Sequence, residues 1–343
     1  MIVAGIAVSS FSMNAFARDH IEIVGSSTVY PFATVVAETF GKKTKFKTPK
    51  IESTGSGGGM KLFCAGNGID TPDITNASRR IKKSELEKCN AKGVKLTEVK
   101  IGYDGIAIAN AKSAPKYNLT RQTIFFAMAK QVPEITADGK YTGKLVPNTY
   151  TKWNQILPDL PATAIKVMGP PPTSGTRDAF AELAMEGGCK TVPWIKALKK
   201  TNKKEYKIIC HTVREDGAYI EAGENDNLIV QKLVASPNML GVFGFSFLDQ
   251  NSDKVQGSSI DGKDISFANI ASGQYPVSRP LYFYIKNAHV GKVPGIKEFV
   301  AEFTADSTWG DNGYLSEKGM IPMPKTERGS FSLAANSLKS LSL

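Results

Sequence analysis

Short apolar runs alternate with amphipathic segments along most of this chain. The runs rich in β-branched residues predict strands over 21–25, 51–54, 73–77, 94–101, 105–109, 164–168, 240–245 and 280–286. The segments with helical spacing of apolar residues predict helices over 28–40, 60–65, 120–130, 178–186, 227–235 and 295–304. Because strands and helices alternate, the pattern predicts an α/β architecture with a mostly parallel sheet. Ser84 and Glu87 predict a capping box for a further helix, and the tail after residue 324 is expected to fray.

Three turns between a predicted strand and the segment after it share one composition. They are Gly25–Thr28, Thr54–Gly59 and Thr173–Asp178, and each places glycines and small hydroxyl residues directly before a predicted helix. A helix start offers free backbone N–H groups and the positive end of the helix dipole, and glycine lets a ligand approach the backbone. In open α/β sheets, ligands bind beyond the carboxyl ends of the strands. The three turns together predict one oxyanion held from several sides, between two lobes.

The length of 343 residues is enough for two domains, and 41% hydrophobic with 22% charged residues is typical of a globular protein. Residues 1–17 differ from the rest because they are uncharged, mostly apolar, and end in Ala15-Phe16-Ala17. This segment predicts a secretory signal peptide that is cleaved after Ala17, with a short apolar strand as the alternative. No later segment has the roughly 18 apolar residues that a membrane span requires.

The four cysteines are Cys64, Cys89, Cys189 and Cys210. An even number in an exported protein favours disulfides. Of the three possible connectivities we favour Cys64–Cys89 with Cys189–Cys210, because each bridge would then staple one local unit. Four free thiols are the alternative. A zinc site is not expected, since the chain has no C-x-x-C motif and its three histidines are scattered.

The formal net charge is +11, and part of the excess lies in lysine clusters at 42–47 and 196–207. Such a field attracts anions and speeds their capture. Nucleic acid is not the expected partner, because the lysines are mixed with acidic residues and no nucleic-acid-binding motif is present. A solvated lysine-rich face is the alternative for each cluster taken alone.

Five motifs, in order along the chain, resemble the signature loops of the PstS family, the periplasmic phosphate-binding proteins of Pst ABC transporters. The motifs are Gly25-Ser26-Ser27-Thr28-Val29-Tyr30-Pro31, Thr54–Gly59, Ala77-Ser78-Arg79, Tyr103-Asp104-Gly105-Ile106-Ala107 and Thr173-Ser174-Gly175-Thr176, with a further landmark at 275–281. The resemblance covers roughly residues 19 to 324. It implies the type II periplasmic-binding-protein fold, in which two α/β lobes are joined by crossover strands and the ligand lies in the cleft. Lobe I would comprise 18–105 and 275–343, and lobe II would comprise 106–274.

The resemblance also implies the residues that would bind phosphate. Hydroxyl and amide donors would come from Ser27, Thr28, Val29, Ser56, Ser174, Gly175 and Thr176. The family pattern has a carboxylate after the Ala-Ser of the third motif, where this chain has Arg79. We therefore expect Arg79, and secondarily Arg177, to supply the charged bidentate contact. Asp104 is the candidate for the carboxylate that accepts the phosphate proton.

As a member of this family the protein would be a periplasmic monomer without cofactor or metal, and not an enzyme. It would capture inorganic phosphate and deliver it to the inner-membrane Pst permease, which a cytoplasmic ATPase drives. A receptor for sulfate, molybdate or arsenate is the main alternative, because Arg79 stands where the family has the carboxylate that accepts the phosphate proton and repels sulfate. A secreted phosphatase is less favoured, since the chain has no G-x-S-x-G elbow, Walker A motif or clustered metal ligands. An exported sensor or adhesive protein would bind no small anion.

Overall fold

The computed structural model describes residues 18–172, 174–222 and 226–342. The predicted signal peptide at 1–17 lies outside the described residues, as does Thr173 of the third turn. Within the described ranges, no helix is both long and apolar enough to cross a membrane.

One mixed sheet of nine strands runs through the molecule. In spatial order its strands are β2 (Lys50–Ser53), β1 (Glu22–Gly25), β3 (Ile74–Ala77), β13 (Ser278–Lys286), β4 (Leu96–Ala111), β10 (Leu240–Gly244), β8 (Val167–Gly169) and β9 (Tyr219–Glu221), with β11 (Val255–Gly257) beside β4. The strands at each end of this order pair in parallel, whereas β13 and β4 pair antiparallel with each other and with their neighbours. The sheet is therefore mixed, and the prediction of a mostly parallel sheet is wrong for the connecting strands. Two small sheets pair β5 (Asn118–Leu119) with β12 (Ser259–Ile260), and β6 (Gln131–Ile135) with β7 (Tyr141–Pro147).

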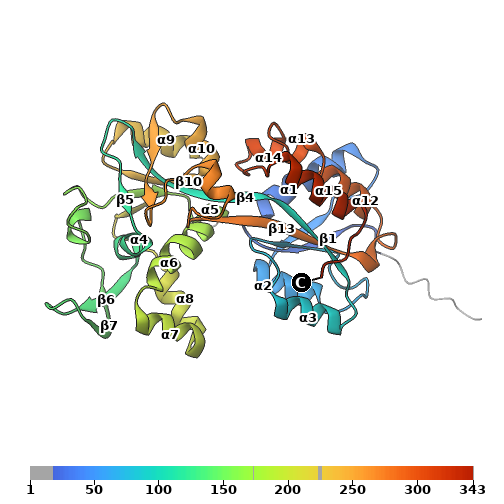
Figure 1. Cartoon of the computed structure of the whole chain (residues 1–343), viewed down its shortest axis with the longest axis horizontal. Helices are drawn as coiled ribbons and strands as arrows, with labels where there is room; N and C mark the ends of the chain where they lie inside the picture. The colour runs from blue at the N-terminus through green and yellow to red at the C-terminus, as the bar shows by residue number, and fades with distance from the viewer. Residues whose placement is uncertain (1–17, 173, 223–225, 343) are drawn as a thin grey trace, which may run out of the picture.

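Helices surround this sheet in two groups, which β4 and β13 connect (Figure 1). The group at the right of Figure 1 holds α1 (Tyr30–Lys43), α2 (Gly55–Phe63), α3 (Lys83–Ala91), α12 (Ile296–Phe303), α13 (Asp306–Trp309), α14 (Tyr314–Glu317) and α15 (Lys325–Asn336). The group at the left holds α4 (Arg121–Met128), α5 (Gly175–Ala179), the π-helix η2 (Phe180–Met185), α6 (Glu186–Cys189), α7 (Pro193–Thr201), α8 (Lys203–His211), α9 (Asp226–Ala235) and α10 (Phe245–Gln250). Between them, α11 (Phe267–Ala271) packs against both connecting strands.

The two predicted strands at 94–101 and 105–109 form a single strand, β4, of 16 residues. All but one of its residues are buried, so it has no exposed edge that would have marked an end. Its length allows it to pair with β13 through one half and with β10 and β11 through the other. The strand therefore physically joins the two groups of helices.

The glycine-rich turn after β2 begins α2 directly, so that its glycines are helical rather than a loop. The reason is close packing against β1. Gly25 has φ +133°, and a side chain there would clash with the carbonyl oxygen of Asn76. A side chain at Gly59 would meet Gly25 and the Thr75 hydroxyl. Small residues at both positions let the first two turns lie against each other.

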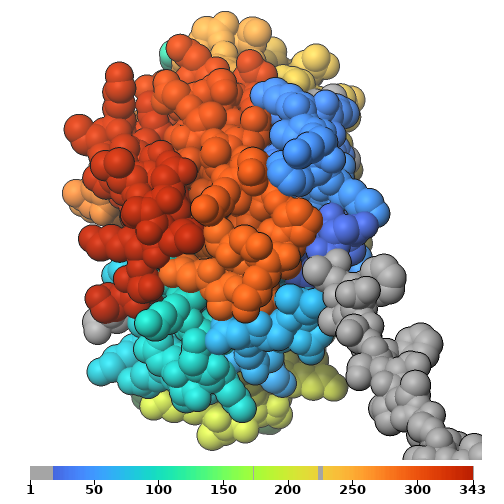
Figure 2. Space-filling model, turned by 90° about the vertical axis from the view of Figure 1, so that its right-hand side faces the viewer, coloured from blue at the N-terminus to red at the C-terminus, as the bar shows by residue number. Residues whose placement is uncertain are grey.

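Two further expectations about helices are wrong. The cap of α3 lies two residues earlier than predicted, because the Glu85 carboxylate accepts the Lys82 N–H at 2.9 Å. The tail after residue 324 does not fray but forms α15. Glu327 of this helix accepts hydrogen bonds from Lys100 at 2.9 Å and from Tyr103 at 3.1 Å, which fix α15 to β4. Figure 2 shows the C-terminal segment, drawn in dark red, separated by orange segments from the blue elements of the start of the chain.

Both disulfides have the favoured pairing, Cys64–Cys89 and Cys189–Cys210, and no cysteine is free. They close segments of 25 and 21 residues, and bridges of this span stabilise a fold by about 3 kcal/mol each in the chain-entropy account. The first ties α2 to α3, and the second ties α6 to α8. Each bridge therefore remains within one group of helices.

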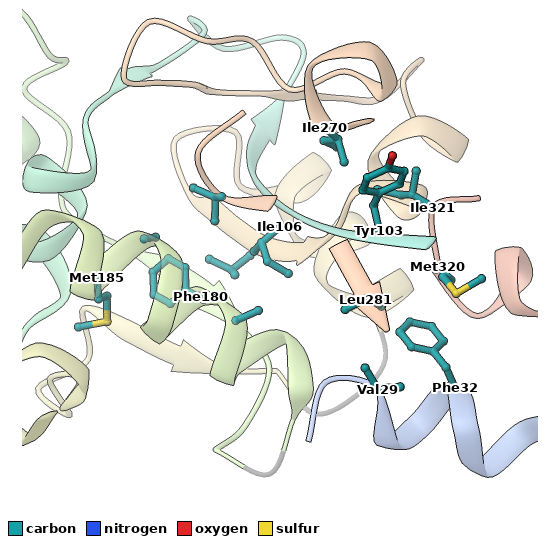
Figure 3. Packing of buried hydrophobic residues seen from close by; sticks show 14 of the residues in the cluster. Val29, Phe32, Tyr103, Ile106, Phe180, Met185, Ile270, Leu281, Met320 and Ile321 are labelled. Carbon is teal, nitrogen blue, oxygen red and sulfur yellow. The ribbon is translucent and has the colours of Figure 1, made fainter. Parts of the chain in front are cut away.

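A continuous apolar core lies beneath the elements that meet in the middle of the molecule. Figure 3 shows Val29, which directly precedes α1, and Phe32 of α1 close to Leu281 of β13. It also shows Ile106 of β4 close to Phe180 of η2. Each of these five side chains is at most 8% exposed. The starts of α1 and of the α5–η2 segment are thus anchored by packing on the two connecting strands.

An ion-pair cluster holds α6, α7 and α8 together. The Glu186 carboxylate lies 2.8 Å from Lys199 Nζ and 2.8 Å from His211 Nε2. Burial alone would raise the pKa of Glu186, but the hydrogen bonds from His211 and Lys199 outweigh it and lower the pKa to about 2. A carboxylate with a lowered pKa stabilises the fold above its unfolded pKa, 4.5, and loses that contribution as the pH falls toward 2.

We therefore expect Glu186→Gln to lower the free energy of unfolding by about 1–2 kcal/mol at pH 7, after allowance for solvent screening. The difference from the parent should shrink from pH 4.5 downward and vanish below pH 2. Urea unfolding at several pH values measures it. The matched control is Glu215→Gln, because the Glu215 side chain is 85% exposed and its carboxylate lies 3.8 Å from Lys130 Nζ. Equal stability of Glu186→Gln and the parent at pH 7 would contradict the argument.

Candidate functional site

A polar cavity of about 500 Å³ lies where the first and third predicted turns meet. Six of the predicted site residues line it, together with residues from α1, α10 and α14. The lining is Ser27, Thr28, Tyr30, Pro31, Phe32, Asp104, Ser174, Gly175, Thr176, Phe247, Glu317 and Lys318. Residues far apart in the sequence are thus brought to one place.

The first turn delivers its hydroxyls at the start of α1. The Ser26 N–H bonds to Asn76 O at 3.0 Å, which ties the turn to β3, and Pro31 occupies the first helical turn, where its missing N–H costs nothing. Val29 caps α1 and is fully buried, so its side chain anchors the turn and does not face the cavity. Thr28 is also buried, whereas Ser27 is half-buried. The start of this 14-residue helix therefore lines the cavity.

The third turn approaches from the other group of helices. Ser174 caps α5, and its Oγ accepts the Thr176 N–H at 3.2 Å. A side chain added to Gly175 would lie 3.2 Å from the Thr28 Cα, so the first and third turns are in contact at this point. Glycine at 175 is what allows the two turns to approach.

The charged centre behind this wall is Arg279 of β13, which is not among the site residues predicted from the sequence. Its guanidinium is 7% exposed and donates to Thr28 Oγ1 and, at 2.7 Å, to Glu182 Oε2 of η2. Arg279 is a buried charge near the start of β13, directly before the apolar and aromatic run 281–285, and that contrast is the signal that could have identified it.

Asp104 faces Arg279 across the β4–β13 pair, where the two residues are in register. Asp104 Oδ2 lies 3.5 Å from Arg279 Nε, too far for a good hydrogen bond, and among the described residues neither atom has a hydrogen-bond partner. Burial raises the pKa of Asp104 above its ordinary value of 3.8, although Arg279 acts in the opposite direction. A buried acceptor without a partner, on the wall of a polar cavity, is suited to a ligand that carries a proton.

The other predicted site residues lie away from this cavity. Ser56 Oγ accepts the Ser78 N–H at 3.1 Å and so joins α2 to the end of β3. Arg79 makes two hydrogen bonds to the Glu85 carboxylate, at 2.8 and 2.7 Å. The Arg177 guanidinium stacks over the Tyr219 ring at 3.9 Å and lines a separate cavity of about 460 Å³. These three residues do not line the cavity, so their placement does not support their predicted roles in binding the anion.

Metal ligands do not gather at this site. In the described parts of the chain, no group of three His, Cys, Asp or Glu side chains is arranged to hold a metal ion. The arrangement instead offers hydroxyl donors, a helix start, one buried guanidinium and one buried carboxyl group, which together suit a small protonated oxyanion.

Comparison with known proteins places this arrangement in a family. The model of the PBP superfamily domain matches residues 12–307. The chain belongs to the PBP superfamily. Among curated PBP relatives, the protein SphX of Synechococcus elongatus is 29% identical over 94% of this chain and 83% of its own length. The phosphate-binding protein PstS of Staphylococcus saprophyticus is 29% identical over 88% of this chain and 80% of its own length.

A solved structure has a similar fold. It is described as a possible phosphate binding protein from Planctomyces limnophilus, and it superposes with a TM-score of 0.71 at 25% identity, covering 93% of this chain and 98% of its own. The resemblance to the PstS family and the two-lobe α/β fold of periplasmic binding proteins, both predicted from the sequence, are thereby confirmed.

Proposed function

We propose that this protein is a solute-binding receptor that captures inorganic phosphate and delivers it to an ABC permease. The observation that carries the proposal is the buried Asp104–Arg279 pair, which is in register on the two connecting strands and behind a wall of hydroxyl groups. The similarity to proteins named for phosphate binding supports the same ligand.

The chemistry of the cavity matches phosphate better than sulfate. Near neutral pH phosphate retains a proton, and Asp104 is an acceptor for it. Sulfate has no proton to offer, so the same carboxylate would repel it. Arg279 supplies positive charge, while Thr28, Ser174 and Thr176 supply hydroxyl donors. Hydrogen bonds to charged groups contribute roughly 1.5–3 kcal/mol each, and several are needed to offset the desolvation of a dianion.

The positions of the lining residues in the chain support closure of two lobes around the anion. We assign 18–105 and 275–343 to lobe I and 106–274 to lobe II, with β4 and β13 as the connecting hinge strands. Ser27 and Thr28 then lie on lobe I, and Ser174, Gly175 and Phe247 on lobe II. Each disulfide stays within one lobe, so neither would hinder hinge motion.

In the cell we place this receptor in the periplasm, as a monomer that docks on inner-membrane permease subunits with a cytoplasmic ATPase. It would carry phosphate unchanged, without cofactor or catalysis. The predicted signal peptide at 1–17 agrees with export. The excess of 11 positive charges would speed the capture of anions.

Calorimetric titration of the purified protein tests the proposal. The protein is unfolded and refolded in phosphate-free buffer to remove bound anion, and then titrated with phosphate, arsenate and sulfate. We expect saturable binding of phosphate and of arsenate, which is also a protonated tetrahedral anion, and no binding of sulfate. Sulfate binding as strong as phosphate binding, or no binding of phosphate, would overturn the proposal.

A further inference from the structure

Two carboxylates of the α5–η2 segment reach across to the opposite wall of the cavity. Asp178 Oδ2 accepts the Ser27 hydroxyl at 2.7 Å, and Glu182 Oε2 accepts Arg279 Nη1 at 2.7 Å. The two acidic residues are four apart, so one helical face presents both. The guanidinium is the group to which the proposed function assigns the charged contact with the anion, and the Ser27 hydroxyl lines the same cavity.

From these contacts we propose that Asp178 and Glu182 are internal placeholders that set the affinity of the site for phosphate. They occupy Ser27 and Arg279 until the anion displaces them. The inference rests on the proposed function, because it concerns the same site. It assigns to two residues outside the cavity wall a role in determining how tightly phosphate is held.

The charges around Arg279 support competition rather than cooperation. A single guanidinium faces two carboxylates, Asp104 at 3.5 Å and Glu182 at 2.7 Å. A dianion that approaches Arg279 therefore meets two negative charges beside the guanidinium, while the nearby Arg79 is already held by Glu85. Because like charges in a poorly solvated site repel strongly, one carboxylate must withdraw or become neutral.

Exposure identifies Glu182 as the carboxylate that can withdraw. Its side chain is 48% exposed, whereas that of Asp104 is 12% exposed and belongs to a buried strand. A half-exposed glutamate can turn into water at little cost, while a buried aspartate cannot. A buried guanidinium, on the other hand, requires a partner at all times. Glu182 satisfies this requirement until phosphate takes its place.

Asp178 competes with phosphate for Ser27 in a similar way, but with a smaller effect. A hydroxyl has one proton to donate, and here that proton is given to Asp178. While the bond persists, Ser27 can accept a hydrogen bond but cannot donate one to phosphate. Displacement of Asp178 would release the donor. Because Ser27 is uncharged, we expect the effect of Asp178 on affinity to be smaller than that of Glu182.

Substitution of the placeholder gives a result of definite sign. Glu182→Gln removes the competing charge, and we expect it to tighten phosphate binding about tenfold. The gain should lie mainly in a faster association rate, because the competitor is absent before the anion arrives. Asp178→Asn should tighten binding by about twofold to threefold. Stopped-flow and calorimetric titration with inorganic phosphate measure both variants.

Controls separate this inference from the proposed function. Glu215→Gln removes an exposed carboxylate that lines the neighbouring cavity, and it should leave the dissociation constant within about twofold of the parent. Glu182→Asp keeps the charge on a shorter side chain, so its affinity for phosphate should increase less than that of Glu182→Gln. If the parent binds phosphate and Glu182→Gln binds it equally or more weakly, Glu182 is a bystander or a clamp and this inference alone is overturned. A parent that binds no phosphate overturns the proposed function and this inference with it.

Discussion

Replacement of Arg279 by methionine should weaken phosphate binding about 100-fold. Its guanidinium is the buried positive charge of the site, and it contacts Thr28 and faces Asp104, both of which line the cavity. Truncation of one member of a buried charge pair costs about 2–5 kcal/mol, and each 1.4 kcal/mol is a factor of ten in affinity. Methionine keeps much of the volume of the arginine stem, so that the loss reports mainly the charge.

Arg79→Met is the matched control for this substitution. The sequence alone favours Arg79 as the charged contact, but its guanidinium is held by Glu85 at 2.7 and 2.8 Å. We expect Arg79→Met to change the dissociation constant by less than about threefold. Calorimetry measures both variants, and thermal unfolding shows whether each is folded. Arg279→Lys keeps the positive charge but lacks the planar guanidinium. Its affinity for phosphate should lie between that of the parent and that of Arg279→Met. A larger loss from Arg79→Met than from Arg279→Met would return the charged role to Arg79.

The local chemistry of the turns was predictable because it depends on neighbours in sequence. Glycine and small hydroxyl residues before a helix identify the starts of α1 and α5, and both starts line the cavity. The disulfide pairing was predictable for the same reason, since each bridge closes a segment of 25 residues or fewer. These features require no knowledge of how distant strands align.

Arg279 was not predictable in the same way, because its role arises from strand register. It lies opposite Asp104 only because β13 and β4 pair antiparallel along their length, although the two residues are 175 positions apart in the chain. The sequence indicates that both strands are buried, but it does not state which residues face each other. Arg79 shows the converse. Its position after a strand resembles the family motif, yet Glu85 in the first turn of α3 takes its guanidinium.

The C-terminal helix shows how tertiary contacts overrule composition. Its residues are polar enough to predict a fraying tail, but Arg328 is 4% exposed and donates to the Met323 carbonyl at 2.6 Å and to Asp311 at 2.9 Å. Glu327 pairs with Lys100 of β4 on the same helix turn. These partners lie outside the segment, so that no local pattern could reveal the helix.

Replacement of Asp104 by asparagine should remove the discrimination between phosphate and sulfate. We expect the parent to reject sulfate because a carboxylate faces an anion that has no proton to share. Asparagine carries no charge and can donate a hydrogen bond, so that sulfate is no longer repelled. The ratio of phosphate affinity to sulfate affinity should fall by at least about 30-fold, equivalent to about 2 kcal/mol. Competitive titration with both anions measures the ratio.

The same substitution should change stability with a definite dependence on pH. Burial raises the pKa of Asp104, so ionisation of this carboxyl costs free energy in the folded state. That cost is absent below the ordinary value of 3.8 and grows as the pH rises past it. The free energy of unfolding of Asp104→Asn, relative to the parent, should therefore increase from about pH 4 upward. Asp264→Asn, which removes an exposed carboxylate paired with Lys116, should show no such trend.

If Asp104→Asn still rejects sulfate as the parent does, the carboxylate is not the group that selects phosphate, and another acceptor must be sought on the cavity wall.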